Sequence, residues 1–172
     1  MKLTLYMAMS IDGFIAKEDD STPWSELEWE SYFSVAKQFK AIILGRRTYE
    51  LMKEDNTFEQ LGNPFTIILS RKKQKAEENG VVVSSPEEAI KALENKGIQE
   101  ALLCGGSETN AAFLNEDLID EIIIDVEPLI FGGGIKIFSS ITSDKTLRLK
   151  KVQKIQQMVQ LHYEVIHANH HV

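Results

Sequence analysis

The sequence contains a single cysteine, Cys104, among 172 residues. One cysteine cannot form an internal disulfide, and it cannot supply the clustered thiolates of a cysteine-based metal site. We therefore predict no metal centre and a reducing, cytoplasmic location. The GxSxG, Walker lysine and HExxH motifs are also missing, so the sequence gives no sign of an esterase nucleophile, a P-loop or a zinc protease site.

Long apolar runs and an excess of positive charge are missing as well. No apolar stretch approaches the roughly 20 residues of a membrane span. The start of the chain superficially resembles a signal peptide, but Ser10 and Asp12 interrupt it and no small-residue cleavage site follows, so we interpret it as a first strand. Lys and Arg number 19 against 26 Asp and Glu, a net charge of −7, which argues against nucleic acid or an anionic membrane as the main partner.

What the sequence does contain is the composition of one folded domain. Hydrophobic residues make up 43% of the chain and charged residues 26%, both ordinary values for a globular protein. The length is sufficient to bury a substantial core. We predict a single domain over residues 1–166, followed by a C-terminal tail over residues 167–172.

Apolar runs of strand length alternate with helical patterns along the chain. Strands are expected at residues 3–9, 41–44, 65–69, 81–83, 101–104 and 119–127, with 14–16 extending the first strand beyond a kink. Helices are expected at residues 25–39, 46–53, 85–93 and 107–115, with a helical turn at 135–138. Residues 147–155 and 158–166 instead predict an antiparallel pair with one exposed face. This order predicts an α/β fold with a mixed, mostly parallel sheet and an antiparallel C-terminal pair.

Open α/β sheets bind ligands at the carboxyl ends of their strands, and the turn after residues 41–44 lies at such an end. Gly45 is followed there by Arg46, Arg47 and Thr48 at the start of a helix. A helix N-terminus offers free N–H groups and a partial positive charge, and arginines add further donors, so the turn predicts a phosphate site. The alternative is that Gly45 only makes the turn and that the arginines are solvated.

Three more strand ends share this character. Gly105 and Gly106 precede Ser107, a combination that allows close approach of a ligand or, alternatively, a tight strand–helix turn. The three glycines at 132–134 predict close approach of a ligand or a mobile loop. Residues 69–71, Leu-Ser-Arg, form a weaker fourth candidate.

Two carboxylates are candidates for proton transfer, and each has a structural alternative. Asp12 lies at the break in the first strand, where it could simply cap a turn. Glu28 follows Pro23-Trp24 in the first turn of a helix, where acidic residues usually stabilise the helix dipole. Cys104 is expected to be a small buried hydrophobic residue.

Taken in order, the segments at residues 9–16, 45–50, 69–71, 104–107 and 120–134 resemble the dihydrofolate-reductase-like superfamily. They are most similar to the C-terminal reductase domain of the bifunctional deaminase/reductase of bacterial riboflavin biosynthesis, the RibD C-terminal domain. The resemblance extends from Leu3 to about Val165. It implies a three-layer α/β/α arrangement, NADPH as hydride donor and a pyrimidine-like or pterin-like acceptor.

The resemblance also implies roles for individual residues. The positions that match NADPH-binding residues of the family are Gly45, Arg46, Thr48, Leu69, Ser70, Arg71, Gly105, Gly106 and Ser107. Trp24, Gly132 and Gly133 are assigned to the substrate side, and Asp12 and Glu28 to proton transfer. One cysteine cannot supply the zinc ligands of the deaminase half of the bifunctional enzymes, so we expect no counterpart of that half in this sequence. Between Tyr49 and Pro64 it also lacks the Asp-Asp-Pro segment and the following arginine that belong to the family's substrate side.

The function predicted from these residues is an NADPH-dependent reduction of a heterocyclic small molecule, resembling 5-amino-6-(5-phosphoribosylamino)uracil reductase. Two alternatives stay open: a dihydrofolate or pterin reductase, and a non-catalytic nucleotide-binding or drug-binding protein on the same fold. A homodimer is also predicted, because the exposed alternating pattern of the last two strands is commonly covered by a partner.

Overall fold

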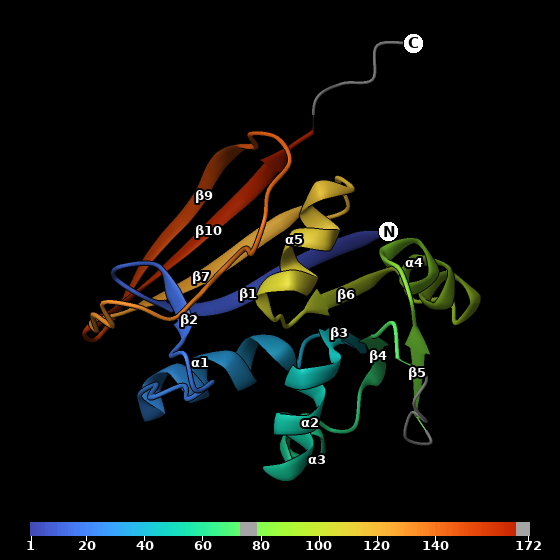
Figure 1. The fold of residues 1–172 in the computed structure, drawn as a ribbon, viewed down its shortest axis with the longest axis horizontal. Helices are drawn as coiled ribbons and strands as arrows, with labels where there is room; N and C mark the ends of the chain where they lie inside the picture. Colours follow the sequence, from blue (N-terminus) through green and yellow to red (C-terminus); the bar gives the residue numbers. More distant parts are fainter. Residues whose placement is uncertain (73–78, 168–172) are drawn as a thin grey trace.

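The computed structural model describes residues 1–72 and 79–167. Its central sheet has the strand order β5-β4-β3-β6-β1-β7-β10-β9 (Figure 1). The parallel strands are β1 (Lys2–Ser10), β3 (Ala41–Gly45), β4 (Phe65–Leu69), β5 (Gly80–Val83), β6 (Glu100–Leu103) and β7 (Glu121–Glu127). The antiparallel strands β10 (Met158–Ile166) and β9 (Thr146–Ile155) follow β7 at one edge. The predicted mixed sheet with an antiparallel end is confirmed.

Helices cover both faces of the parallel part of the sheet. On one face, α4 (Pro86–Asn95) and α5 (Ser107–Asn115) pack Leu93 and Phe113 against Leu5 and Ile43. On the other face, α1 (Glu26–Ala36) and α2 (Arg46–Glu54) pack against Ile42 and Leu44, whose side chains alternate with that of Ile43. A short helix, α3 (Thr57–Gln60), follows α2 and was not expected from the sequence. The three-layer arrangement is therefore confirmed.

Helix starts are of two chemical kinds. α1 and α4 are each capped by a serine, because Ser25 accepts from the backbone N–H of Glu28 and Ser85 from that of Glu88. α2 and α5 begin instead at Gly45 and Gly106, with no side-chain cap. Since the first N–H groups of a helix have no partner within it, α2 and α5 keep these donors available.

Two expectations about the loops were wrong. Residues 14–16 do not extend the first strand; they form a separate strand, β2 (Phe14–Ala16). The helical turn expected at 135–138 is absent from this described segment, because β8 (Ile135–Lys136) pairs there with β2 in a small second sheet. Gly134 explains this: its φ is +146°, and a Cβ there would lie 2.3 Å from the carbonyl oxygen of Ala16. Local periodicity does not reveal such a close approach.

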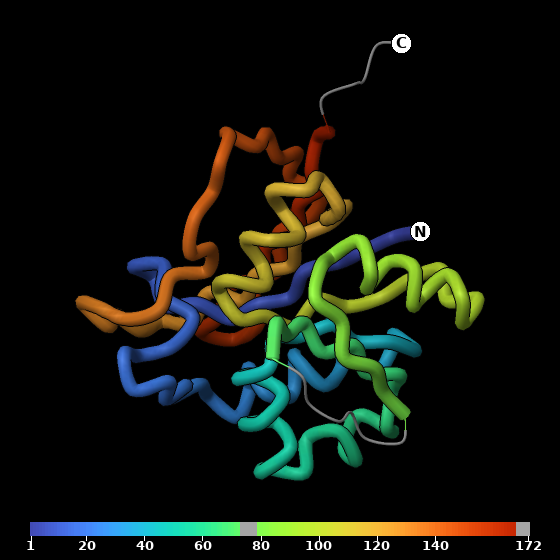
Figure 2. Tube along the Cα trace, turned by 45° about the vertical axis from the view of Figure 1, so that its right-hand side comes forward, coloured from blue at the N-terminus to red at the C-terminus, as the bar shows by residue number. Residues whose placement is uncertain are grey.

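The segment after β8 returns to the far edge of the sheet along α5, as the orange tube passing the yellow helix in Figure 2 shows. Hydrogen bonds fix it there: Asn110 Nδ2 donates to the Ile137 carbonyl, and Asn115 Nδ2 to that of Ser140. Of the predicted tail 167–172, residues 168–172 lie outside the described part of the chain. No helix in the described ranges is long and apolar enough to cross a membrane.

Candidate active site

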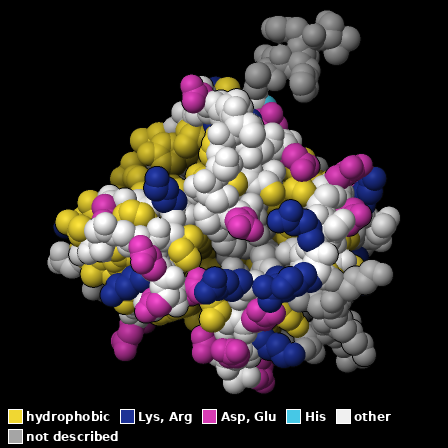
Figure 3. Space-filling view, viewed as in Figure 1, with side chains coloured by type: hydrophobic (Ala, Val, Ile, Leu, Met, Phe, Trp, Pro, Cys, Tyr) yellow, Lys and Arg dark blue, Asp and Glu magenta, His cyan; other side chains and the backbone are white. Residues whose placement is uncertain are grey.

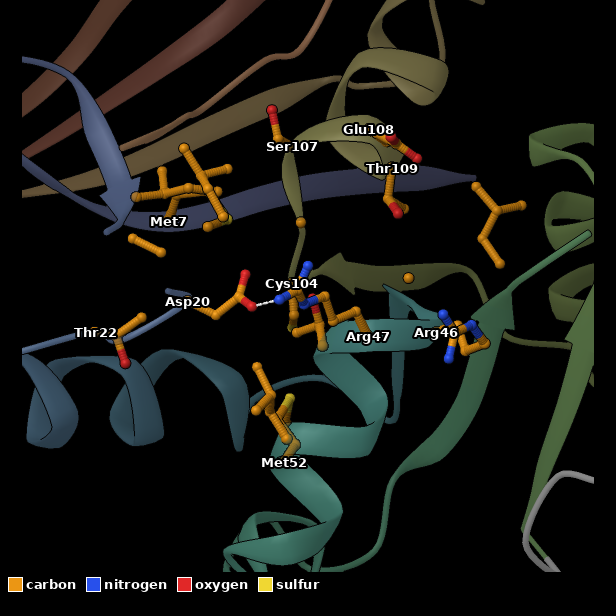
Figure 4. A pocket seen from close by; sticks show the side chains of 18 of the residues that line it. Met7, Asp20, Thr22, Arg46, Arg47, Met52, Cys104, Ser107, Glu108 and Thr109 are labelled. Atoms are coloured by element: carbon orange, nitrogen blue, oxygen red, sulfur yellow. Dashed lines mark ion pairs between the residues drawn. The ribbon is translucent and has the colours of Figure 1, made fainter. Parts of the chain in front are cut away.

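A cleft of about 840 Å³ opens at the carboxyl ends of β1, β3, β4 and β6. The loop before α1 and the first turns of α2 and α5 form its walls (Figure 4). Most of the predicted site residues line it: Trp24, Glu28, Gly45, Arg46, Thr48, Leu69, Ser70, Arg71, Gly106 and Ser107. The sheet topology therefore brings these separate segments together.

The two glycine turns of the cleft touch each other. The backbone N–H of Gly45 donates to the carbonyl of Gly105 over 2.8 Å. A Cβ on Gly45 would lie 2.5 Å from Thr109 Oγ1, and Gly105 has a φ of +92°, so both positions favour glycine. Gly105 itself lies beneath the cleft rather than in its lining. The contact places the uncapped N-termini of α2 and α5 side by side.

The two adjacent arginines of α2 point to opposite ends of the cleft (Figure 4). Arg46 lies toward the β4 end and donates to Glu50 of its own helix at 2.7 Å. Arg47 forms an ion pair with Asp20 from the loop before α1. Sequence reasoning missed Asp20, since nothing local marks it as the partner of a residue 27 positions away (47 − 20).

The cleft therefore has two unlike halves. The half over β4, which we call the cationic half, is lined by Arg46, Ser70, Arg71 and Lys72 together with the open ends of α2 and α5. The first turn of α5 also brings Ser107 and one acid, Glu108, to the cleft. The half against α1, which we call the aromatic half, is lined by Tyr6, Trp24, Glu28, Trp29 and Tyr32. Trp24 is held there by stacking on Phe131, with ring centroids 5.5 Å apart.

Glu28 is a buried carboxyl group at the wall of the aromatic half. Its residue is 2% exposed, and its Oε2 atom is buried with no hydrogen-bond partner. Burial, followed by the negative charge of Asp125, raises the pKa of Glu28 to about 8; a hydrogen bond with Tyr6 lowers it in part, and the charge of Glu127 adds to the rise. At neutral pH this group is therefore mainly protonated and can donate a proton.

Asp12, the other predicted proton donor, does not line the cleft. Its carboxylate accepts from Ser10 Oγ at 2.7 Å and from the backbone N–H groups of Phe131 and Gly132 at 3.1 and 2.7 Å. These hydrogen bonds, that of Ser10 first, hold its pKa below the ordinary value. The geometry fits an anchor for the glycine loop, the capping alternative considered from the sequence. Gly132 and Gly133 lie in this loop, also outside the lining of the cleft.

Comparison with known proteins agrees with this architecture. The chain belongs to the RibD C-terminal domain family, whose sequence profile matches residues 1–161. The protein YwjB of Bacillus subtilis (strain 168), itself described as uncharacterized, is 35% identical over 168 residues, covering 94% of this chain and 97% of that protein.

Solved structures show the same fold at low sequence identity. A Shewanella sp. PV-4 protein named as a candidate riboflavin biosynthesis protein superposes with a TM-score of 0.84 at 23% identity, covering 97% of this chain and all of that one. The deaminase/5-amino-6-(5-phosphoribosylamino)uracil reductase of Thermotoga maritima gives 0.79 at 22% identity, covering 96% of this chain and 56% of the bifunctional chain. The chain therefore shares the fold of these solved structures, and the family predicted from the sequence, that of the RibD C-terminal domain, is confirmed.

Proposed function

We propose that this protein is an NADPH-dependent reductase of a small heterocyclic molecule, related in its reaction to 5-amino-6-(5-phosphoribosylamino)uracil reductase. The observation that carries the proposal is the division of one cleft into a cationic half with two uncapped helix N-termini and an aromatic half with a protonated carboxyl group. Phosphates bind helix N-termini and arginines, whereas a flat ring stacks on aromatic side chains.

The residues divide the work accordingly. Thr48, Ser107 and the free N–H groups of α2 and α5 would hold the phosphates that NADPH shares with NADH. Arg46 would contact the additional phosphate of NADPH, with Ser70 and Arg71 at the adenosine end. The bound nicotinamide supplies a hydride. Trp24 and Tyr32 would align the acceptor ring, and Glu28 would supply the proton. Catalysis then depends mainly on positioning the two reactants.

A pterin-like acceptor is the second candidate, favoured by the charges of the aromatic half. Arg47, which also lines the cleft, is already paired with Asp20, and Lys17 lies over the Phe131 ring that stacks on Trp24. The family's Asp-Asp-Pro segment and following arginine are missing from the sequence as well. An acceptor without a phosphate, bound through ring nitrogens at Glu28, would also suit this half of the cleft.

The cofactor assignment is tested by the Arg46→Ala variant. A hydrogen bond to a charged group contributes roughly 1.5–3 kcal/mol, so NADPH affinity should fall about 10- to 150-fold while NADH affinity changes little. Quenching of Trp24 and Trp29 fluorescence measures both. The matched control is Arg148→Ala. Arg148 is an exposed arginine that also pairs with a glutamate, Glu164, but it lies on β9, away from the cleft. Equal affinity of the wild type for NADH and NADPH, or an equal loss of both in Arg46→Ala, would contradict the assignment.

Turnover is a separate question, answered by the decay of NADPH absorbance. The acceptors to compare are 5-amino-6-(5-phosphoribosylamino)uracil and dihydrofolate, which represent the first and second candidates. Oxidation of NADPH with either acceptor supports a reductase and selects between them. Tight NADPH binding with no oxidation by any heterocyclic acceptor would favour the non-catalytic alternative.

We also propose that the protein works as a homodimer through the outer strands. Exposed Leu147, Leu149, Val152 and Val159 lie on β9 and β10. Figure 3 shows hydrophobic side chains gathered over these strands. An apolar sheet face of this kind is a typical interface between copies of a chain.

A further inference from the structure

A buried group of acids lies behind the aromatic half of the cleft, and only one of its members, Glu28, lines the cleft. Asp125 is 0% exposed and Glu127 3% exposed, both on β7. The Tyr6 hydroxyl, from β1, joins two of the acids, at 2.6 Å from Asp125 Oδ2 and 3.3 Å from Glu28 Oε1. Ser25 Oγ donates to Glu127 at 2.6 Å, so this acid already has its own donor.

The hydroxyl of Tyr6 carries one proton and faces two carboxyl groups. The contact with Asp125 is the shorter of the two, at 2.6 Å against 3.3 Å, so the proton of Tyr6 points to Asp125. The hydroxyl oxygen then faces Glu28 with a lone pair. A carboxylate at Glu28 would meet this lone pair and a second buried negative charge, both unfavourable. A neutral Glu28 brings no second charge to this lone pair, and its proton can lie on Oε2, the oxygen without a hydrogen-bond partner.

We propose that Asp125, acting through Tyr6, is a positioning residue that keeps Glu28 neutral and proton-carrying and leaves its Oε2 atom free for a ligand. Oε2 of Glu28 and Oδ1 of Asp125 are buried and have no hydrogen-bond partner. The other oxygen of each carboxyl group, Oε1 of Glu28 and Oδ2 of Asp125, contacts the Tyr6 hydroxyl. The significance for catalysis rests on the proposed reductase function. Glu28 would give its proton to a ring nitrogen of the acceptor as the adjacent carbon accepts a hydride, and the resulting carboxylate would regain a proton from water.

Among the other groups facing Glu28, the two carboxyl groups raise its pKa, and the hydrogen bond with Tyr6 lowers it by less. The groups facing Glu28 are Tyr6 from β1, Asp125 and Glu127 from β7, and Tyr32 from α1 itself. None of these is a cation that could stabilise a second carboxylate. Ser31 also hydrogen-bonds the Tyr6 hydroxyl and in turn accepts from Gln160 on β10, which fixes the hydroxyl in place.

The proposal is tested on the protein without cofactor or acceptor, by carbon-13 NMR titration of glutamate side-chain carboxyl groups. The Glu28 signal is assigned with Glu28→Gln. In the wild type its midpoint should lie at about 8. In Asp125→Asn it should fall by about one pH unit or more, a tenfold change in the protonation equilibrium. Glu121→Gln is the matched control, because it removes another buried carboxylate of β7 and should leave the midpoint unchanged.

A second variant and a second measurement keep the proposal testable if Asp125→Asn does not fold. Asp125→Ser is smaller, neutral and still able to accept from Tyr6, and it should shift the midpoint in the same direction. The infrared band of a buried protonated carboxylic acid should be present in the wild type at pH 7 and absent from Glu28→Gln. A wild type without this band, or an Asp125 variant with an unshifted Glu28 midpoint, would overturn the proposal. Neither result depends on NADPH binding. The proposed reductase function is tested separately, so failure of one proposal can be distinguished from failure of the other.

Discussion

The inner strands β3, β4 and β6 and the outer strands β9 and β10 belong to one sheet but are covered differently. Ile42, Ile43 and Leu44 are all 0% exposed, because helices pack on both faces of β3. Along β9, in contrast, every residue before Ile155 is exposed. The cleft opens at the ends of the strands that are packed on both faces, which suits a reaction that depends on positioning.

The outer strands β9 and β10 have two chemically distinct faces. Leu147, Leu149 and Val152 are exposed on one side. On the other side, Arg148 pairs with Glu164, and Glu121 of β7 receives Lys2, Lys150 and His162. The inner sheet is thus stabilised by burial, and the outer sheet by ion pairs and, in our proposal, by a second copy of the chain.

The largest expected effect comes from truncating one leucine in each region. Leu103 of β6 is 0% exposed, so Leu103→Ala should lower the free energy of unfolding by about 2–5 kcal/mol. Leu149 of β9 is 52% exposed, and Leu149→Ala should cost less than about 0.5 kcal/mol in the monomer. Urea unfolding measures both. Similar losses of unfolding free energy in the two variants would contradict the contrast between the regions. A loss in Leu149→Ala that grows with protein concentration would instead indicate that Leu149 stabilises the dimer.

The ionic face predicts a pH-dependent effect of intermediate size. Burial raises the pKa of Glu121, but hydrogen bonds from Lys150, His162 and Lys2 outweigh it and lower the pKa to about 2. Since the folded pKa lies below the ordinary value of 4.5, the stabilisation is present above pH 4.5 and is lost as pH falls toward 2. Glu121→Gln should therefore cost about 1–3 kcal/mol at pH 7 and progressively less in acid.

Urea unfolding of Glu121→Gln at pH 7 and near pH 3 measures this dependence. Glu164→Gln is the control, because its partner Arg148 is exposed and surface ion pairs contribute little. A loss for Glu121→Gln that is equally large at both pH values would show that packing, and not charge, is responsible.

The apolar face predicts an effect on association rather than on folding. Leu149→Lys places a charge at the centre of the proposed interface and should convert the dimer to a monomer. Light scattering should give twice the chain mass of 19.5 kDa for the wild type and the single mass for the variant. Arg148→Ala, on the opposite face, should remain dimeric. A wild type that scatters as a monomer at micromolar concentration would refute the dimer.

The smallest expected effect is local and concerns Asp12. Asp12→Asn weakens the acceptor for the N–H groups of Phe131 and Gly132, so these two amides should exchange hydrogen faster while the unfolding midpoint stays unchanged. Hydrogen-exchange NMR measures the difference. Because the pKa of Asp12 is lowered, the wild-type loop should stay protected well into the acid range. If Asp12→Asn lost NADPH oxidation without faster amide exchange at Phe131 and Gly132, Asp12 would act as a proton donor and not as an anchor of the loop.

Much of the fold was predictable because each element has a local cause. The apolar runs of β3 and β4, the serine cap and Pro86 of α4, and the alternation in β10 all act within a few residues of the chain. The β2–β8 pair was not predictable, because it joins Phe14 to Lys136 and depends on the space that Gly134 leaves for a distant carbonyl. For the site, the glycine turns were visible, whereas the hydrogen bonds of Asp12 with Phe131 and Gly132 and the Asp20–Arg47 pair required the folded chain.

The sequence by itself determined the order of strands and helices and the glycine turns that end the strands, since backbone conformation and hydrophobic periodicity are properties of neighbouring residues. Only the tertiary structure decided which acids lie together. Tyr6 and Asp125 are 119 residues apart in the chain but meet at 2.6 Å, because β1 and β7 pair in parallel at a particular register. A shift of that register by one residue would turn Asp125 to the opposite face of the sheet. The proton on Glu28 therefore depends on strand pairing, which no local pattern in the sequence specifies.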